Sequence, residues 1–185
     1  RSKTAEVTAV EAMDFAPVHP ERGPSLVLAI IHVRYTASPS EYYSVPVTFR
    51  PQLKDAESQP ILTVPMTSRD LSLYDALRDP AAALAMHRII ELEEVVEGRE
   101  GRFRGVRTPA FEPYSGTSAQ VHALEGEQSN SNIVFGETSV LKVFRKLETG
   151  ENPDLEVSRF LAERTDFRSF PALQGWIEYS SESGF

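Results

Sequence analysis

The stretch SVLKVFRKLETGENPDLEVSRFLAE, Ser139–Glu163, joins a strand-like run to a helix-like run. Alternation along its first residues puts Lys142 on one strand face with the apolar residues two positions away on either side. Asn152 and Pro153 are typical of a helix start, because the Asn side chain accepts an orphan amide hydrogen bond and proline loses no helical bond there. The stretch therefore predicts a strand, a loop and a helix.

Lys142 and Glu156 within this stretch each have two interpretations. A strand lysine can lay its methylene groups along apolar surface with the ammonium in water, and a glutamate near a helix N-terminus interacts favourably with the helix dipole. Alternatively, a lysine flanked by apolar residues stays charged beside an anion, and Glu156 lies on the helix face of Phe160. The two residues would then form an ion pair that directs the ammonium toward phosphate oxygens.

Antiparallel β-structure is expected upstream. Alternating or β-branched runs predict strands over 5–15, 25–35, 41–49 and 60–66, separated by turn-forming residues. From Leu73 to Val96 the apolar residues recur at helical spacing, with Asp79 and Pro80 as the start and Gly98 as the end. A further strand over 97–111 is expected to belong to the same unit.

The turn-rich segment Glu112–Ser118, EPYSGTS, is the expected domain boundary. After it the pattern predicts strands over 119–125, 131–136, 137–145 and 170–181, with a helix between the last two. The predicted fold class is α+β: a unit made of an antiparallel sheet with a helix over 1–112, then a sheet with one helix over 119–185. This second unit is expected to bury one sheet face beneath its helix and leave the other face open.

Composition excludes several function classes. The formal net charge of −8 argues against a general nucleic-acid binder. The chain has no cysteine and four histidines without metal-ligand spacing, so we expect no protein metal site, and a cytoplasmic location is favoured. No apolar run approaches the roughly 20 residues of a membrane helix. Because the chain begins without methionine, we interpret it as a fragment of a longer protein.

The loop EGEQSNSN, Glu125–Asn132, is the candidate phosphate-covering segment. Its polar residues Gln128, Ser129, Asn130 and Ser131 could present amides and hydroxyls to phosphate oxygens. However, it contains only Gly126 and matches neither common glycine-rich phosphate motif. The alternative that it is an ordinary hairpin loop remains open.

Three segments resemble the maltokinase family when they are taken together: EQSNSN at 127–132, VLKVFRKLE at 140–148 and NPDLEVSRFL at 152–161. These bacterial enzymes, free-standing or fused to trehalose synthase, use ATP to convert maltose to maltose 1-phosphate. LYDALRDP at 73–80, followed by a helix, is similar to the β-rich N-terminal cap of the family.

The resemblance implies an aminoglycoside-phosphotransferase-like kinase fold, in which 119–185 begins the N-lobe. Lys142 would contact the ATP phosphates, Glu156 would orient it, and Gln128 to Ser131 would lie in the loop that covers the phosphates. The family places the catalytic aspartate and the magnesium-binding acid in a C-lobe. The sequence contains no such lobe, so we expect no catalytic or metal-binding residue here and no turnover by the chain alone.

Two alternatives stay open. Another capped small-molecule kinase of the same fold, such as a glucosamine kinase, would share the strand lysine and the helix glutamate. A non-catalytic docking module, which contacts a trehalose synthase through its β cap, would need neither residue.

Overall fold

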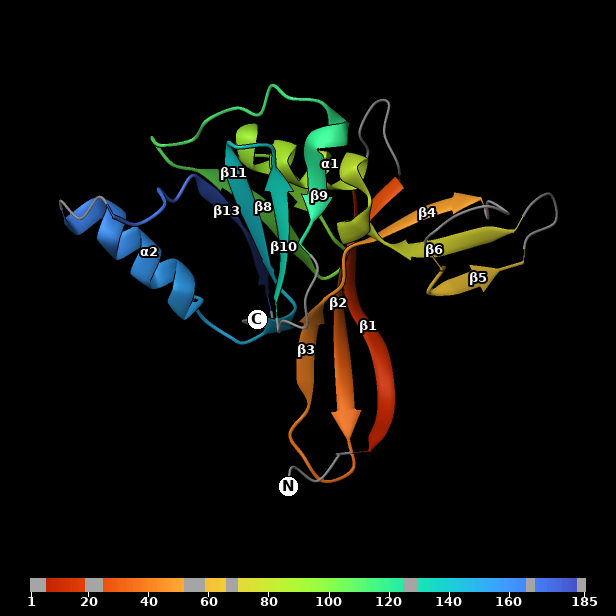
Figure 1. Ribbon diagram of the computed structural model, residues 1–185. Helices are drawn as coiled ribbons and strands as arrows, with labels where there is room; N and C mark the ends of the chain where they lie inside the picture. Colours follow the sequence, from red (N-terminus) through yellow and green to blue (C-terminus); the bar gives the residue numbers. More distant parts are fainter. Residues whose placement is uncertain are drawn as a thin grey trace.

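A computed structural model describes residues 6–18, 25–51, 59–65, 70–124, 130–165 and 169–182. The described residues form an α+β fold with two α-helices and mostly antiparallel sheets, which confirms the predicted class (Figure 1). Neither helix of the described chain has the length and apolar content needed to cross a membrane.

The largest sheet in the described residues has seven strands and is built on the long strand β2. β1 pairs along one edge of β2, while β3 and β4 share the other edge. β6 pairs with β4, β5 pairs with β6, and β12 adds to β3 from much later in the chain. The bounds are β1 Val7–Val18, β2 Ser25–Tyr35, β3 Glu41–Ser44, β4 Val47–Pro51, β5 Leu62–Val64, β6 Leu71–Asp75 and β12 Lys146–Leu147.

Two prolines set the bounds of the elements around them. The single strand predicted over 41–49 is interrupted at Pro46, which has no amide hydrogen for the ladder. The predicted helix start at Asp79 and Pro80 is confirmed: α1 is Pro80–Glu91, and Asp79, its cap residue, is extended at φ −104° and ψ 110°, as expected before a proline. The helical spacing noted from Leu73 does not give a helix before Pro80, because Leu71–Asp75 is the strand β6.

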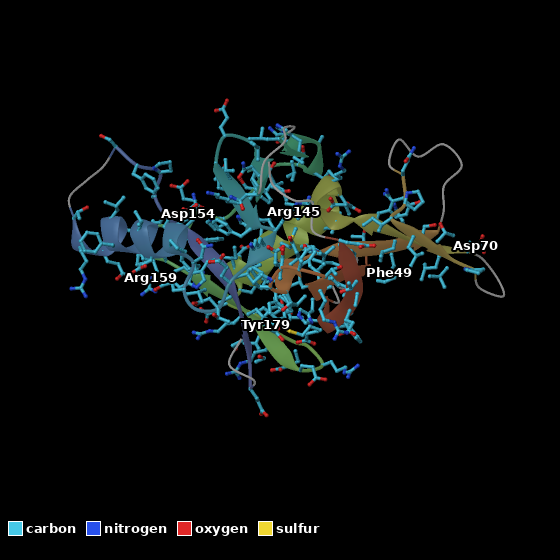
Figure 2. All side chains as sticks on the ribbon, turned by 90° about the horizontal axis from the view of Figure 1, so that it is seen from below. Phe49, Asp70, Arg145, Asp154, Arg159 and Tyr179 are labelled. Atoms are coloured by element: carbon cyan, nitrogen blue, oxygen red, sulfur yellow. The ribbon has the colours of Figure 1, made fainter. Side chains whose placement is uncertain are left out.

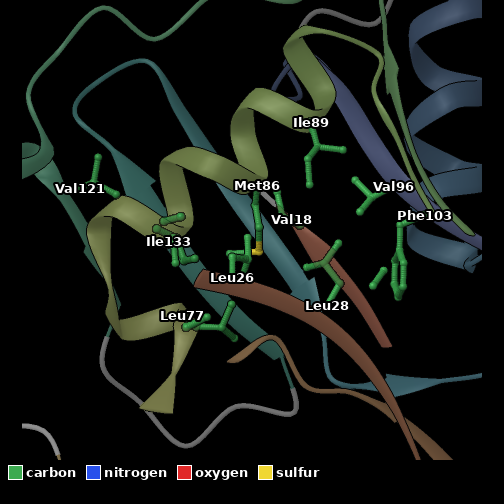
Figure 3. Packing of buried hydrophobic residues seen from close by; sticks show 14 of the residues in the cluster. Val18, Leu26, Leu28, Leu77, Met86, Ile89, Val96, Phe103, Val121 and Ile133 are labelled. Atoms are coloured by element: carbon green, nitrogen blue, oxygen red, sulfur yellow. The ribbon is translucent and has the colours of Figure 1, made fainter. Parts of the chain in front are cut away.

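Helix α1 covers a core drawn from both halves of the chain (Figure 3). Met86 and Ile89 on α1 are buried in one hydrophobic cluster with Leu26 and Leu28 of β2. A fully buried side chain of this kind contributes about 1.5–3 kcal/mol. The other labelled members are Val18, Leu77, Val96, Phe103, Val121 and Ile133.

A three-stranded sheet in the described residues joins the two expected domains. β8, Gly101–Arg107, lies between β7, Val95–Glu97, and β13, Gly175–Ser181. The strand after α1 lies outside the seven-stranded sheet, since β8 pairs with β7 and with the last strand. Gly105 allows α1 to lie on this sheet, because a Cβ there would stand 2.0 Å from the carbonyl oxygen of Ile89. The division at 112 stays a prediction.

A buried carboxylate ties β1 to this second sheet. Asp14, fully buried, accepts hydrogen bonds from the backbone amides of Phe15 at 2.7 Å, Arg99 at 2.7 Å and Glu100 at 3.1 Å. The hydroxyl of Tyr179 on β13 donates to it at 2.9 Å. Burial alone would raise the pKa of Asp14, but these donors together lower it below the usual value.

Gly98 has a different role from the predicted end of a helix. Helix α1 ends at Glu91, and Glu93 takes the positive φ of 51° that follows it. Gly98 lies between β7 and β8, where a Cβ would stand 2.5 Å from an oxygen of Asp14. The glycine therefore makes room for the buried carboxylate.

We predict that Asp14→Ala lowers the free energy of unfolding by about 1.5–3 kcal/mol or more, because buried donors lose a charged acceptor. Urea denaturation measures the loss in unfolding free energy, and Glu97→Gln, at an exposed position of β7, is the control. Because the folded-state pKa of Asp14 is depressed, its stabilisation is present above the unfolded-state pKa of about 3.9 and lost as the pH falls below it. Equal unfolding free energies for Asp14→Ala and Glu97→Gln would contradict this role.

Candidate functional site

Lys142 lies on a hairpin whose two faces differ in character. β10, Asn130–Phe135, pairs with β11, Ser139–Phe144, and with β9, Val121–Ala123. Ile133 and Phe135 are fully buried on the inner face, and Leu141 and Val143 pack against the same core. Lys142 is on the outer face, as the alternation in the sequence predicted.

Two asparagines share the outer face with the lysine. Asn132 is directly opposite Lys142 in the strand register, and Asn130 is opposite Phe144. The Lys142 ammonium lies 4.9 Å from the centre of the Phe144 ring, within the range of a cation–π contact. Sequence analysis selected Asn130 but missed Asn132, although period-two alternation from Asn130 was sufficient to place both on one face.

Ser131, another predicted phosphate-loop residue, lies on the opposite face. Its hydroxyl oxygen accepts a hydrogen bond from Nε of Arg145 at 2.8 Å. Ser131 therefore binds the arginine that connects the hairpin to the cap, and it does not lie on the face that carries Lys142. Gln128 and Ser129 lie outside the described residues. Of the predicted loop residues that the structure describes, only Asn130 shares a strand face with Lys142.

Helix α2, Pro153–Arg164, begins as predicted, with the Asn152 side chain accepting from the Asp154 amide at 2.9 Å. Lys142 forms its ion pair with Asp154, which projects from the first turn (Figure 2). The expected pair between Lys142 and Glu156 is absent from the described ion pairs. Two positions along a helix turn a side chain by about 200°, so Asp154 and Glu156 cannot face the same lysine.

The position of α2 also differs from the expectation that it covers the hairpin. No side chain of α2 is fully buried, and Phe160 is 59% exposed. The Phe160 face is thus open, which removes the reason for turning Glu156 inward. α2 approaches β13 through Arg159, whose guanidinium lies 5.4 Å from the centre of the Trp176 ring. The covered face of the hairpin packs on the core beneath α1 instead.

A cluster of polar side chains surrounds Glu41, where Lys146, just after β11, meets β2 and β3. Glu41 of β3 accepts hydrogen bonds from Lys146 at 2.7 Å, Tyr43 at 2.5 Å and Tyr35 at 2.9 Å. The Lys146 ammonium first, and then the two hydroxyls, lower the pKa of Glu41 to about 2. The same carboxylate raises the pKa of Tyr43. Sequence analysis had no signal for this cluster, since Glu41 and Lys146 are distant in the chain.

The outer face carries one ammonium and, on the adjacent strand, two asparagine side chains. The first turn of α2 beside it carries two carboxylates, Asp154 and Glu156, and the first of them pairs with Lys142. Within the described ranges, no three His, Asp or Glu side chains lie close enough together to hold a metal ion. The described part of this face therefore offers one cation, already paired with a carboxylate, and two carboxamides.

Comparison with known proteins gives a match over residues 1–79 to the family described as the maltokinase N-terminal cap domain. The matched segment contains β1 to β6 and ends at Asp79, the cap residue of α1. It does not include the hairpin that carries Lys142. The match therefore bears on the cap sheet and not on the hairpin.

We predict that a double-mutant cycle will couple Lys142 to Asp154 but not to Glu156. The Lys142–Asp154 side chains are 44% and 59% exposed, so the coupling in unfolding free energy should be about 0.2–1 kcal/mol. Urea denaturation of Lys142→Met, Asp154→Asn and their double variant measures it, and the cycle with Glu156→Gln is the control. Stronger coupling to Glu156 would contradict the observed pairing.

Proposed function

We propose, from the match of residues 1–79 to the maltokinase N-terminal cap domain, that this chain supplies the nucleotide side of an ATP-dependent maltose kinase. In that reaction the γ-phosphoryl group of Mg-ATP passes to the anomeric hydroxyl of maltose, giving maltose 1-phosphate and ADP. The observation that supports the role is the placement of Lys142 on the outer face of the hairpin, opposite Asn132 and next to the start of α2.

Lys142 would bind phosphate oxygens while keeping its ion pair with Asp154. An ammonium has three donors, so it can hold Asp154 and still donate to a phosphate. Asp154 then restricts the lysine from the helix side, which is the orienting role that sequence analysis assigned to Glu156. Asn130 and Asn132 would add carboxamide donors from the neighbouring strand.

The remaining chemistry would come from outside the described residues. On the resemblance to maltokinases, a C-lobe carries the base that positions the sugar hydroxyl and the acid that binds magnesium. The metal supplies charge neutralisation between the phosphates. We therefore propose that this chain by itself binds Mg-ATP without transferring phosphate, and that transfer requires the intact enzyme.

We predict that Lys142→Met will lower maltose phosphorylation by the intact enzyme by about 100-fold or more, because a donor to the transferred charge is lost. The assay follows ADP release and maltose 1-phosphate. Arg104→Met is a matched control, since Arg104 is an exposed strand cation on β8 whose carboxylate partner is Glu178 at 3.6 Å.

Normal turnover by Lys142→Met would overturn the assigned role. Glucosamine as the acceptor tests the competing activity: phosphorylation of glucosamine but not maltose would replace the proposed substrate by that of a related kinase. The same enzyme without acceptor gives the background rate of ATP hydrolysis.

A further inference from the structure

Arg145 connects the lysine-bearing hairpin to the cap sheet through both its side chain and its backbone. Its Nε donates to Ser131 Oγ at 2.8 Å, and its Nη2 donates to Asp75 Oδ2 at 3.1 Å. Its carbonyl oxygen accepts from the amide of Ser44 at 2.7 Å. Figure 2 shows Arg145 near the middle of the molecule. One residue thus bonds to β10, to the end of β6 and to the end of β3.

Asp75 is a fixed partner, unlike the carboxylate of a typical surface ion pair. Its second oxygen accepts from the amide of Leu77 at 3.0 Å, as the cap of the short 3-10 helix Ala76–Arg78. The following residue, Ala76, donates to the carbonyl oxygen of Pro46 at 3.1 Å and is fully buried. The Asp75 side chain is only 28% exposed. Because the cap fixes Asp75 in this way, Asp75 in turn fixes the guanidinium of Arg145.

The chain after Arg145 is held to the cap as well. Lys146 and Leu147 pair with Tyr43 and Tyr42 of β3, and Leu147 packs against the hydrophobic core. The Lys146 ammonium adds its hydrogen bond to Glu41 at 2.7 Å. The last part of β11 therefore cannot shift along its axis without breaking cap contacts.

These contacts lie close to the proposed nucleotide-binding side chains. Arg145 follows Lys142 by three residues, a span of about 10 Å in extended chain. Ser131, which it holds, stands between Asn130 and Asn132 in the chain. A hydrogen-bonded hairpin moves as a unit, so a displacement of Arg145 reaches both strands that present the phosphate donors.

We propose that Arg145 and Asp75 are positioning residues through which the cap sheet sets the place of Lys142 and its neighbouring asparagines for nucleotide binding. The inference rests on the proposed nucleotide role of Lys142. In this proposal the cap sheet affects nucleotide binding without touching the nucleotide. A substitution at the end of β3 or of β6 is then expected to change nucleotide affinity.

The test titrates this chain with a fluorescent ATP analogue and Mg²⁺, well below the thermal unfolding midpoint of each variant. Arg145→Gln and Asp75→Asn should each weaken binding about 5- to 10-fold. The double variant should bind no more weakly than the weaker single, because both changes break one link. Asn at position 75 keeps an acceptor for the Leu77 amide, so this variant should remain folded.

Two further variants separate positioning from general stability. Arg145→Lys keeps a cation beside Asp75 and should recover part of the lost affinity. Arg34→Gln removes an exposed ion pair between β2 and β1, with Glu11, and should bind within about 2-fold of the original chain.

The outcomes distinguish the positioning role of Arg145 and Asp75 from the proposed nucleotide role of Lys142. If Lys142→Met binds the analogue as tightly as the original chain, the proposed nucleotide role fails. If Lys142→Met loses binding while Arg145→Gln and Asp75→Asn bind like Arg34→Gln, the nucleotide role stands and the positioning inference is overturned. Fully additive effects of the two changes would also overturn it.

Discussion

The burial of helix α1 is the constraint on which the rest of the structure depends. Its inner face is covered by the cap sheet and also by β8, and Gly105 lets the helix backbone approach β8 closely. The same core takes in the inner face of the hairpin through Ile133. Neither half of the described chain can bury its apolar face without this helix, so the cap and the hairpin are packed as one core. The pairing of β8 with β13 follows from the same arrangement.

Because the inner face of the hairpin is used for packing, its outer face is free to carry polar function. The strand alternation that buries Ile133 and Leu141 leaves Lys142 and Asn132 outside. The inner side supports the position of the strands, and the outer side carries Lys142 and Asn132 beside the apolar Val140 and Phe144. This division explains how a lysine can stand between apolar neighbours in sequence while its ammonium remains half exposed and paired with Asp154.

The connection between β11 and the cap gives this site its second support. Arg145 bridges Ser131 and Asp75, and β12 extends the cap sheet immediately after it. Asp14 performs a similar function elsewhere, since it joins β1 to the sheet that contains β13. In both places a carboxylate close to the core gathers donors from separate segments. The match to the maltokinase cap over 1–79 includes both Asp14 and Asp75, so each lies in the cap segment and holds a later part of the chain.

The sequence by itself determined the α+β class, both helix starts, most strands and the face of Lys142. These are local properties: side-chain alternation and the cap-then-proline pairs Asp79–Pro80 and Asn152–Pro153 depend only on neighbouring residues. The tertiary structure alone decided which strands pair, why Asp154 and not Glu156 meets Lys142, and where Ser131 points. Those outcomes depend on packing between segments up to 165 positions apart, as in Asp14 and Tyr179, and local periodicity carries no information about such contacts.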